Sequence, residues 1–287
     1  MSYQIITDSA CDLPAQMLQD LNIVTVPLIV NFRGEARNDS VADDQVKELY
    51  DAMRSGEVAT TSAVNPDGWA KVIEPSLAAG KDALVMAFSS GLSTTYQSAV
   101  IAAEELKEKY PERTVLVVDA LSAALGQGLL VWYTCKKRDE GLSLEALAAW
   151  VEENKYHVAH WFTVDDLVYL KRGGRVSAAT AMLGTMLNIK PVLRVDDEGH
   201  LISMIKARGR KAAINALASK LGETGGSWDN STVFICHADA VEDAQKLADL
   251  VKENYGVKEA FISNLGAVIG SHAGPGTLAF FFMADHR

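Results

Sequence analysis

The sequence contains no apolar run that is long enough to cross a membrane. Apolar runs such as Leu278–Ala284 and Leu129–Val131 fall well short of the roughly 20 residues that a spanning helix needs. Residues Met1–Gln4 include no basic stretch that leads into an apolar one, so a secretory signal peptide is not expected either. We therefore predict a cytoplasmic protein whose contact with membranes is at most transient.

Cysteine and positive charge are scarce as well. Cys11, Cys135 and Cys236 are far apart and lack the paired spacing of a zinc site or a redox motif, which predicts buried, reduced thiols. The formal net charge of −10 disfavours broad binding to nucleic acid, because that affinity depends on Lys and Arg beside phosphates. A DNA-binding regulator is disfavoured further by the lack of a recognisable helix-turn-helix pattern.

The composition is that of an ordered globular protein. Hydrophobic residues make up 48% of the 287 positions and charged residues 22%, which is enough apolar material for two domains. Short apolar runs without strict alternation are typical of strands buried on both faces of a parallel sheet. Such runs occur at Ile5-Ile6, Val24–Val30, Ala83–Phe88 and Val115–Val118. Helical patterns separate them, so we predict a three-layer α/β domain with a parallel sheet over residues 1–156.

The pattern changes in the second half of the chain. Ile189–Val195 and Leu201–Ala207 flank a short acidic turn, which predicts an antiparallel hairpin. Farther on, strands expected at Val233–Cys236 and Ala260–Ser263 bracket a helix. We therefore predict a second α/β domain, with a mixed sheet, over residues 157–287.

One polar stretch, Ser89–Tyr96, follows a buried strand and leads directly into a helix. The first backbone N–H groups of a helix have no partner within it, so an anion is favoured at such a place. Ser93 or Thr94 can add a hydroxyl group to this site. Alternatively, Ser93 only caps the helix, as serines commonly do. Both interpretations stay open on spacing alone.

Two further polar turns are expected near the same ligand. Thr60–Ser62 precedes another helix, and Thr7–Ser9 follows the first strand. In an open parallel sheet, ligands bind beyond the carboxyl ends of the strands, so these turns should converge with the first one. Asp8 and Ser9 also suit an N-cap or an Asx-turn, which is the alternative interpretation.

His272 lies within the glycine-rich segment Gly270–Gly276, just before an apolar strand expected at Thr277–Met283. The flexible backbone predicts an irregular loop from which the imidazole can approach a ligand closely. A lone loop histidine can equally be structural or solvated. The other histidines have no acidic or cysteine partner at ligand spacing, so we predict no metal site.

Two basic clusters stand out in this acidic protein, at Arg172–Arg175 and Lys206–Lys211. Local positive patches of this kind can meet an acidic partner or a phosphorylated group. Ordinary solvated surface charge is the alternative.

With these residues in view, the chain resembles the DegV family, which includes the FakB subunits of bacterial fatty-acid kinase. Five motifs match in the order of the family and span nearly the whole chain. They are Ile6–Ser9, Thr61-Ser62, Ser89–Ser93, Gly173–Arg175 and His272–Gly276. The resemblance implies two α/β domains that enclose a long-chain fatty acid, with its carboxylate at the edge between the domains.

The family also implies which residues hold the carboxylate. A threonine of its Thr-Ser motif, the second serine of its Ser-Gly-Leu-Ser motif and the histidine before Gly-Pro-Gly correspond here to Thr61, Ser93 and His272. Further head-group contacts are expected from the same polar turns, at Asp8, Ser9, Ser62 and Thr94. The sequence departs from the family at Thr94, where many members have glycine, and at Ala63, where glutamine is common.

The resemblance implies a partner as well. A separate ATP-dependent kinase subunit would phosphorylate the bound carboxylate, and this chain would carry the fatty acid or the acyl-phosphate toward phospholipid synthesis and a downstream acyltransferase. The chain itself has no Walker-type loop or kinase signature, so we expect a carrier rather than an enzyme, with a bound fatty acid and no cofactor. Arg175 and Arg208 are the candidates for docking the kinase.

An acyl tail needs an apolar tunnel. We expect this tunnel in the domain of residues 157–287, which also contains the His272 segment. Each buried CH₂ group contributes roughly 0.8 kcal/mol to binding. The candidate lining residues are Met182, Leu183, Met186, Leu187 and the strand Phe280–Phe282. Ordinary core packing explains these residues equally well.

A rival hypothesis comes from another class of protein. Ser93, Asp119 and His272 occur in the chain order of the catalytic residues of α/β-hydrolases, which suggests a serine hydrolase of lipid esters. A nucleophile elbow, however, requires glycine two residues after the serine, and Thr95 stands there. The sequence therefore favours the carrier.

Overall fold

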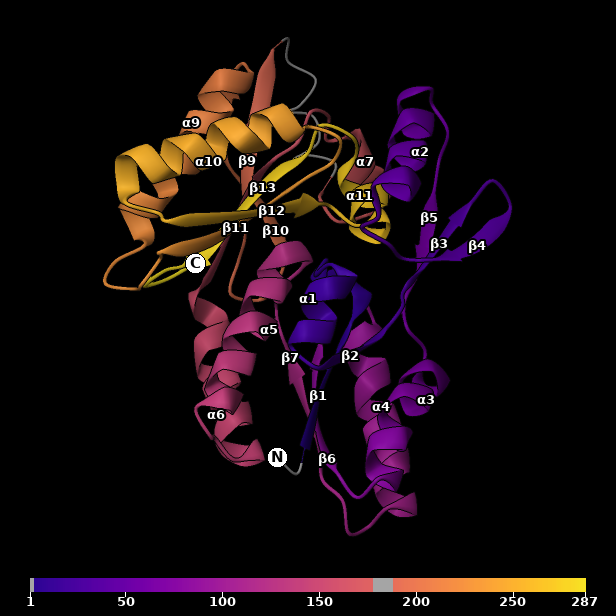
Figure 1. Cartoon of the computed structure of the whole chain (residues 1–287). Helices are drawn as coiled ribbons and strands as arrows, with labels where there is room; N and C mark the ends of the chain where they lie inside the picture. Colours follow the sequence, from indigo (N-terminus) through magenta and orange to yellow (C-terminus); the bar gives the residue numbers. More distant parts are fainter. Residues whose placement is uncertain (1–2, 178–187) are drawn as a thin grey trace.

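The computed structural model describes residues 3–177 and 188–287, and the strands of this part form three sheets (Figure 1). The first sheet has four parallel strands in the order β2-β1-β6-β7. These strands are β1 (Tyr3–Asp8), β2 (Ile23–Val26), β6 (Asp82–Ala87) and β7 (Val115–Asp119). Ile5 of the central strand pairs with Ile23 on one side and with Leu84 on the other. The predicted parallel sheet is confirmed.

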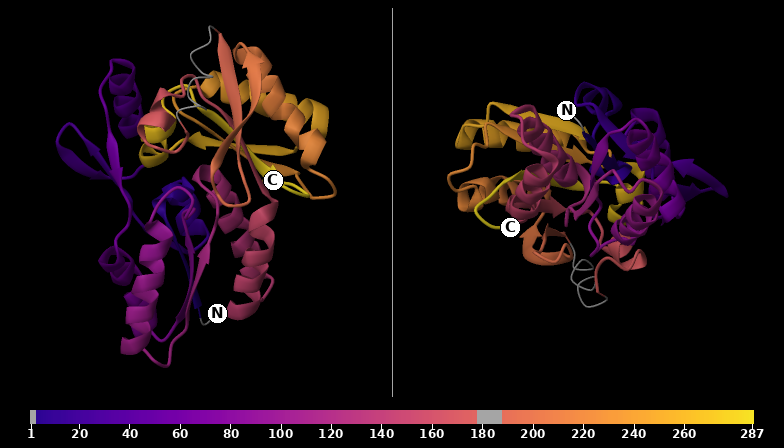
Figure 2. Two further views of the ribbon diagram at one scale, coloured as in Figure 1. Left: turned by 180° about the vertical axis from the view of Figure 1, so that it is seen from behind. Right: turned by 90° about the horizontal axis from the view of Figure 1, so that it is seen from below.

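Helices cover both faces of this sheet, as the view from behind also shows (Figure 2). Helices α3 (Pro66–Ala78) and α4 (Thr95–Lys109) pack on one face, and α5 (Ala124–Asp139) and α6 (Leu144–Asn154) lie on the other. The side chain of Asn65 accepts a hydrogen bond from the Gly68 N–H (2.8 Å), and Pro66 occupies the first turn. These two features explain where α3 begins. The predicted three-layer arrangement is confirmed.

One predicted strand is wrong in extent. The apolar run Val24–Val30 divides between β2 and β3 (Ile29–Phe32), and the two strands belong to different sheets. Pro27 stands between them, and it has no N–H group to donate to a neighbouring strand. The chain therefore leaves the first sheet at this proline.

The second sheet has six strands in the order β10-β9-β8-β13-β11-β12. Its strands are β8 (Val158–Thr163), β9 (Ile189–Val195), β10 (Leu201–Arg208), β11 (Thr232–His237), β12 (Glu259–Asn264) and β13 (Leu278–Met283). Only β11 and β12 run parallel, so the predicted mixed sheet is confirmed, as is the hairpin of β9 and β10. Helices α9 (Arg210–Thr224) and α10 (Val241–Tyr255) cover one face, and α5 packs against β8, β11 and β13.

A third, three-stranded sheet was not predicted. Strands β4 (Glu35–Asn38), β3 and β5 (Thr60–Ser62) form it, and with α2 (Asp43–Arg54) they make what we call the three-stranded unit, residues 29–62. The unit precedes α3 in sequence, yet it contacts α11 (Ala267–Ala273) of the second half (Figure 1).

Hydrogen bonds fix the three-stranded unit to the second half. The Tyr50 hydroxyl donates to the carbonyl of Leu265 (2.7 Å), and the Ala267 N–H donates to the carbonyl of Ser40 (3.0 Å). The predicted division at residues 156 and 157 falls within the short helix η2 (Lys155–His157), between α6 and β8. That boundary stays a prediction. Residues 29–62 precede it in the sequence, yet they pack against the second half, so a single cut in the sequence does not separate the two halves.

Cys11, Cys135 and Cys236 are all buried, as predicted. Among residues 3–177 and 188–287, no helix combines the length and the apolar composition that a membrane crossing requires.

Candidate functional site

A cavity of about 390 Å³ lies where the first sheet, the second sheet and α11 meet. Apolar residues form most of its wall, and they come from all three regions. They include Leu28, Phe88, Ala123, Ala124, Phe162, Val195, Leu201, Val268, Ile269, Ala279 and Phe281. A cavity of this volume and character is typical of a small-molecule binding site.

Polar side chains mark one end of the cavity. Thr61, Ser93, Thr94, Arg175 and His272 all line it. The Thr61 hydroxyl lies 2.8 Å from Nε2 of His272, although 211 positions separate the two residues in sequence. The predicted head-group residues Thr61, Ser93 and His272 therefore line a single cavity.

Thr61 faces the cavity because of the alternation of β5. It pairs with Val30 of β3, and the next residue, Ser62, points to the opposite face of the strand. There the Ser62 hydroxyl accepts a hydrogen bond from the side-chain amide of Asn31 (3.1 Å). Ser62 does not line the cavity, so the structure does not support the expected head-group contact from this residue.

His272 lies in the last turn of helix α11, so the predicted irregular loop is wrong. Of the glycines in this segment, Gly270 is inside the helix, where a Cβ atom would lie 2.1 Å from the Tyr50 hydroxyl oxygen. Gly274, with φ of 85°, ends the helix. The glycines thus serve close packing and termination, rather than a flexible loop.

The imidazole of His272 is uncharged at neutral pH. Burial and the nearby guanidinium of Arg175 lower the pKa of His272 to about 4. Gly173 makes the close packing around this ring possible, since a Cβ atom at that position would lie 2.2 Å from Nδ1 of His272. Gly173 belongs to a predicted motif, but its contact with His272 could not be inferred from sequence spacing.

Ser93 lies two residues before the first residue of helix α4 and lines the cavity. Its hydroxyl accepts the Thr95 N–H (3.2 Å) and lies 2.8 Å from the Thr95 hydroxyl, at the start of α4. The N–H groups of Gly91, Leu92 and Ser93, which precede the helix, are bonded to Ser89 and so are not available to a ligand. Hydroxyl groups, with Thr94 also lining the cavity, supply the polarity of this turn.

Asp8 and Ser9 lie away from the cavity wall. The buried Asp8 carboxyl accepts the N–H groups of Phe88 (2.7 Å) and Ala10 (3.1 Å), and burial raises the pKa of Asp8 to about 7. The Ser9 hydroxyl donates to Asp39 (2.9 Å) and accepts the Leu28 N–H (2.9 Å). The capping interpretation of Asp8 is therefore right, and neither residue is placed to contact a ligand's head group.

Arg175 bridges two of the predicted motifs. Its Nε and Nη2 atoms donate to the carbonyl of Leu92 at 3.2 and 2.9 Å, which joins the turn after α7 (Val168–Arg172) to the turn before α4. Burial lowers the pKa of Arg175, and its side chain lines the cavity. This position differs from the free surface position that was expected of a docking residue.

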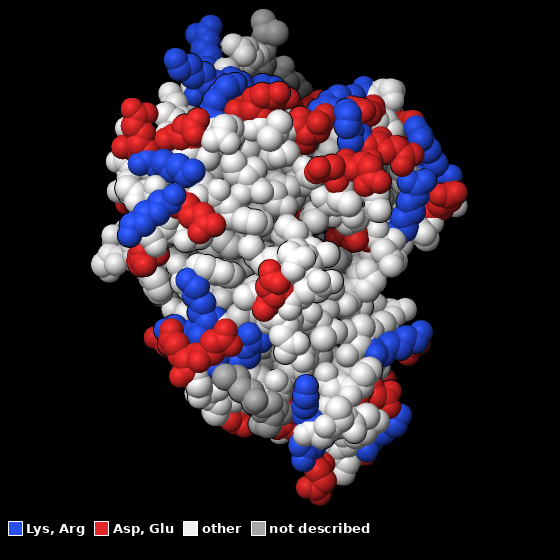
Figure 3. Space-filling view, viewed as in Figure 1, with Lys and Arg blue, Asp and Glu red and all other residues white. Residues whose placement is uncertain are grey.

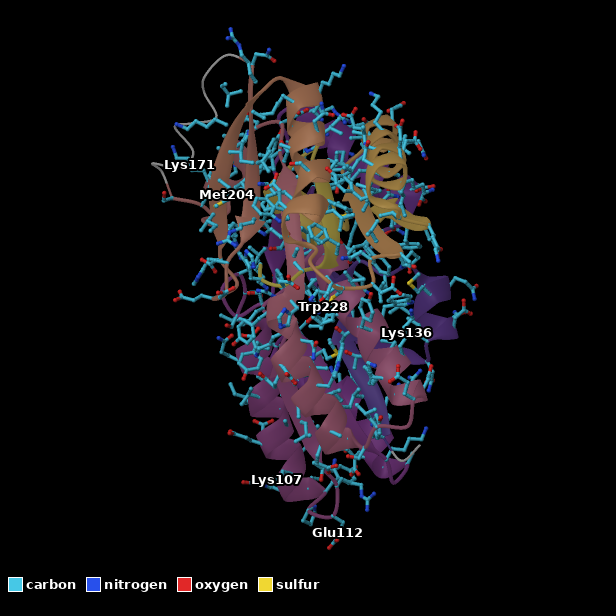
Figure 4. All side chains as sticks on the ribbon, turned by 90° about the vertical axis from the view of Figure 1, so that its left-hand side faces the viewer. Lys107, Glu112, Lys136, Lys171, Met204 and Trp228 are labelled. Atoms are coloured by element: carbon cyan, nitrogen blue, oxygen red, sulfur yellow. The ribbon has the colours of Figure 1, made fainter. Side chains whose placement is uncertain are left out.

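Arg208, the other expected docking residue, is exposed at the end of β10. Figure 3 shows acidic and basic side chains interspersed over the visible face, with basic side chains grouped at its upper edge. On another side of the molecule, Lys171 of α7 and Met204 of β10 point outward from the second half (Figure 4), and Met204 is 48% exposed.

The geometry does not assemble a serine hydrolase site. His272 lies beside Thr61, and the Ser93 hydroxyl is engaged with Thr95. Asp119 accepts the N–H groups of Ser90 (3.2 Å) and Leu121 (3.0 Å) and is not part of the cavity wall. Within the described residues, a Ser-His-Asp hydrogen-bond chain is therefore not formed.

The expected tunnel residues divide into two groups. Phe281 lines the cavity, whereas Phe280 and Phe282 lie on the other face of β13 in the core under α9 and α10, because side chains alternate along a strand. The expectation for Phe280 and Phe282 is therefore wrong. The remaining candidates, Met182, Leu183, Met186 and Leu187, lie outside the described residues.

One cavity residue, His160 of β8, was not singled out from the sequence. It is 2% exposed and lies among apolar lining residues. The sequence signal is a histidine inside an otherwise apolar strand, between Ala159 and Trp161. Such a residue is costly to bury unless its ring nitrogens find partners.

Two α/β halves around a mostly apolar cavity, with polar side chains beside Thr61 and His272, are typical of proteins that bind a small amphipathic molecule. A profile of the DegV family, described as uncharacterised proteins, matches residues 2–285. The chain belongs to the DegV family.

Relatives match over nearly their whole length. A DegV domain-containing protein of Clostridium perfringens is 44% identical over 286 residues, which cover 99% of this chain and 98% of the relative. The structure of a fatty-acid-binding DegV family protein from Thermus thermophilus is similar with a TM-score of 0.87 and 34% identity, covering 99% of this chain and 100% of that chain.

The Fatty Acid Kinase B3 protein of Streptococcus pneumoniae, solved with linoleic acid, has a similar fold. Its TM-score is 0.86, and the match covers 99% of this chain and 100% of that chain. The two sequences are 23% identical, so this likeness concerns the fold alone.

Proposed function

We propose that this protein binds a long-chain fatty acid, with the carboxylate at Thr61, Ser93 and His272 and the acyl chain in the cavity. The observation that carries the proposal is the 2.8 Å contact between the Thr61 hydroxyl and Nε2 of His272 at the polar end of an apolar cavity. The fatty acid bound by the similar Thermus thermophilus protein supports the same ligand class.

The polar end can replace the water that a carboxylate loses on burial. Burying an ionised carboxylate is costly unless hydrogen bonds or charges compensate for it. The hydroxyls of Thr61 and Ser93 can donate to its oxygens, and the single N–H group of the neutral His272 can donate to the carboxylate in place of the contact with Thr61. The guanidinium of Arg175 adds a positive charge close to His272.

The apolar wall accounts for the rest of the affinity. Each CH₂ group that leaves water contributes roughly 0.8 kcal/mol, before the losses of translational and conformational entropy are subtracted. A long chain can therefore bind tightly even though the head group has few partners. A mostly apolar wall, with polar side chains beside Thr61 and His272, suits a ligand of this kind.

We further propose that the protein presents the carboxylate to a separate ATP-dependent kinase subunit. The subunit would transfer the γ-phosphoryl group of ATP to a carboxylate oxygen, which yields ADP and an acyl-phosphate. The motifs shared with FakB subunits support this step, and the fold of the Fatty Acid Kinase B3 protein agrees with it. In this scheme the chain is a non-catalytic carrier in the cytoplasm, without a cofactor, that delivers acyl groups to an acyltransferase for phospholipid synthesis.

The exposed Arg208 is the better placed of the two candidates for docking the kinase. Arg175 is already bonded to Leu92, so its substitution would disturb the cavity as well as a surface. Arg208→Ala is therefore expected to slow phosphorylation by the kinase subunit and to leave fatty-acid affinity unchanged. An equal rate for wild type and variant would remove Arg208 from the docking surface.

Mass spectrometry of an organic extract of the purified protein tests the ligand. We expect a long-chain fatty acid to be recovered, or to bind when it is added to delipidated protein. His272→Ala should then weaken binding, whereas the matched control Ser62→Ala, on the opposite face of β5, should not. An extract without fatty acid, together with no binding of added acid, would overturn the proposal.

A chromogenic ester tests the rival function. The carrier hypothesis predicts that wild-type protein does not turn the ester over. Turnover by wild type that is lost in Ser93→Ala would establish the hydrolase instead.

A further inference from the structure

Ser89 is fully buried and holds the turn that carries Ser93. Its carbonyl oxygen accepts the N–H groups of Leu92 (3.0 Å) and Ser93 (3.1 Å). Its hydroxyl accepts the Gly91 N–H (3.2 Å), so every backbone N–H group from Gly91 to Ser93 is bonded to this one residue. The position of Ser93 at the cavity therefore depends on where Ser89 lies.

The hydroxyl of Ser89 is fixed by the second half of the molecule. Ser89 Oγ donates to the carbonyl oxygen of Gly199 (3.0 Å), which lies in the turn between β9 and β10. A hydroxyl has one proton, so this bond orients it and leaves its lone pairs for the Gly91 N–H. The bond joins the turn that carries Ser93 to what we call the β9–β10 turn, residues 196–200.

Two glycines allow these turns to approach backbone to backbone. A Cβ atom at Gly91 would lie 2.8 Å from the carbonyl oxygen of Glu198, and a Cβ atom at Gly199 would lie 2.1 Å from Ser89 Oγ. Gly199 also has a φ of 79°, which residues with a side chain rarely adopt. A side chain at either position would push the two turns apart, so the close approach depends on both glycines.

The β9–β10 turn has a defined position of its own. The Asp196 carboxylate accepts the N–H groups of Glu198 (3.0 Å) and His200 (2.8 Å), which closes the turn. Nη1 of Arg287 donates both to the carbonyl of Asp196 (3.0 Å) and to the carbonyl of Leu121 (2.7 Å), just after β7. Arg287 thus holds the β9–β10 turn against the first half, beside Ser89.

We propose that Ser89 is a positioning residue that, together with the β9–β10 turn, fixes Ser93 at the carboxylate site before the ligand binds. The inference rests on the proposed fatty-acid binding and extends its head-group site into residues that do not touch the ligand. Ser89 is not part of the cavity wall, so it acts through Ser93. A donor that is already in place loses little conformational entropy on binding, which favours tight binding of the carboxylate.

A double-mutant cycle with stearic acid tests whether Ser89 acts through Ser93. Delipidated wild type, Ser89→Ala, Ser93→Ala and the double variant are each titrated with the acid. We expect each single variant to bind about tenfold more weakly, and the double variant to bind within about twofold of Ser93→Ala, because a hydroxyl that is gone cannot be misplaced. Losses that multiply to about a hundredfold would show that Ser89 acts independently of Ser93 and would overturn the proposal.

Thr134→Val is the matched control. It removes another fully buried hydroxyl that donates to a carbonyl, that of Leu130 (2.7 Å), away from the cavity wall. This variant should bind stearic acid as the wild type does. A loss equal to that of Ser89→Ala would show a general effect of buried hydroxyls and contradict the positioning role.

The outcomes separate this inference from the proposed function. If the wild type does not bind stearic acid, fatty-acid binding itself is wrong. If Ser93→Ala binds as the wild type does, Ser93 is not a head-group residue and the inference fails with that assignment. If Ser93→Ala weakens binding and Ser89→Ala does not, only the role of Ser89 is overturned.

Amide hydrogen exchange of the wild type covers the case in which Ser89→Ala does not fold. A turn that is fixed in advance should protect the N–H groups of Leu92 and Ser93 in delipidated protein, before any acid is added. Exchange at the rate of an unstructured chain, with protection appearing only after stearic acid is added, would show that the ligand orders the turn and would contradict the proposal.

Discussion

Thr61 is the residue whose removal most directly tests the polar end of the cavity. In Thr61→Val the side chain keeps its shape but loses the hydroxyl that lies 2.8 Å from His272. Hydrogen bonds to charged groups are worth about 1.5–3 kcal/mol, so fatty-acid affinity should fall roughly tenfold to a hundredfold. Calorimetric titration measures the change, with Ser62→Ala as the control. Equal losses in both variants would show that β5 matters for folding and not for the head group.

Asp8 should give the protein a measurable pH dependence of stability. Its carboxyl has a pKa of about 7 in the fold and about 4 in an unfolded chain, so between these values the folded state holds a proton that the unfolded state releases. Its contribution to stability is therefore present below about pH 4 and is lost as the pH rises through 7, by on the order of 4 kcal/mol at most.

In Asp8→Asn, this loss between acidic and neutral pH should disappear, although the variant is less stable overall because it has fewer acceptors for Phe88 and Ala10. Urea unfolding of both proteins at several pH values measures the difference. Parallel stability curves for wild type and variant would contradict the prediction.

Individual site residues could be predicted from the sequence when a family motif identified them. Thr61, Ser93 and His272 could be named from family motifs, and all three line one cavity. Asp8 also belongs to a family motif, yet its carboxyl accepts hydrogen bonds from the backbone N–H groups of Phe88 and Ala10. No spacing rule distinguishes a carboxyl that caps a turn from one that faces a ligand, since both follow a strand.

At the element scale, the position of α11 determines the geometry of the proposed head-group site, because this helix carries His272. Gly270 lets α11 approach α2, and a methyl group there would overlap the Tyr50 hydroxyl. Gly270→Ala should therefore lower the free energy of unfolding by about 1–3 kcal/mol, as overpacked cores do, and weaken fatty-acid binding. Thermal unfolding and ligand titration provide the two readouts.

A rescue variant checks that the Tyr50 hydroxyl is the cause. Tyr50→Phe removes the oxygen that the new methyl group would meet, at the cost of its bond to Leu265. The double variant should be less destabilised than the sum of the two single variants, because the residues are in contact. Strictly additive destabilisation would show that the methyl group is accommodated elsewhere.

The elements themselves were predictable where the apolar pattern was strong. The four parallel strands and the hairpin of β9 and β10 follow directly from it. The three-stranded unit did not, because β4 is exposed along its whole length and β5 has only three residues. Short polar strands carry no alternation that a sequence pattern can reveal.

At the scale of the whole molecule, a ligand in the cavity should stabilise the entire fold. The cavity wall combines residues from both halves of the chain, so a bound fatty acid contacts both. At a free concentration one hundred times its Kd, such a ligand adds about 2.7 kcal/mol to the stability of the native state. The Tm of delipidated protein should rise by several degrees with saturating stearic acid, and by less in Thr61→Val at the same concentration. A Tm that does not respond to the acid would contradict this.

The three-stranded unit places part of the N-terminal half of the sequence against the second half of the molecule. It brings Thr61 against α11, so Thr61 and His272 lie together, whereas Ser93 lies on the turn before α4, where Arg175 is bonded to Leu92. In the proposed complex, a separation of the halves would therefore remove Ser93 from the carboxylate and leave Thr61 and His272 beside it. The measured affinity for the carboxylate would therefore also report how strongly the two halves of the protein associate.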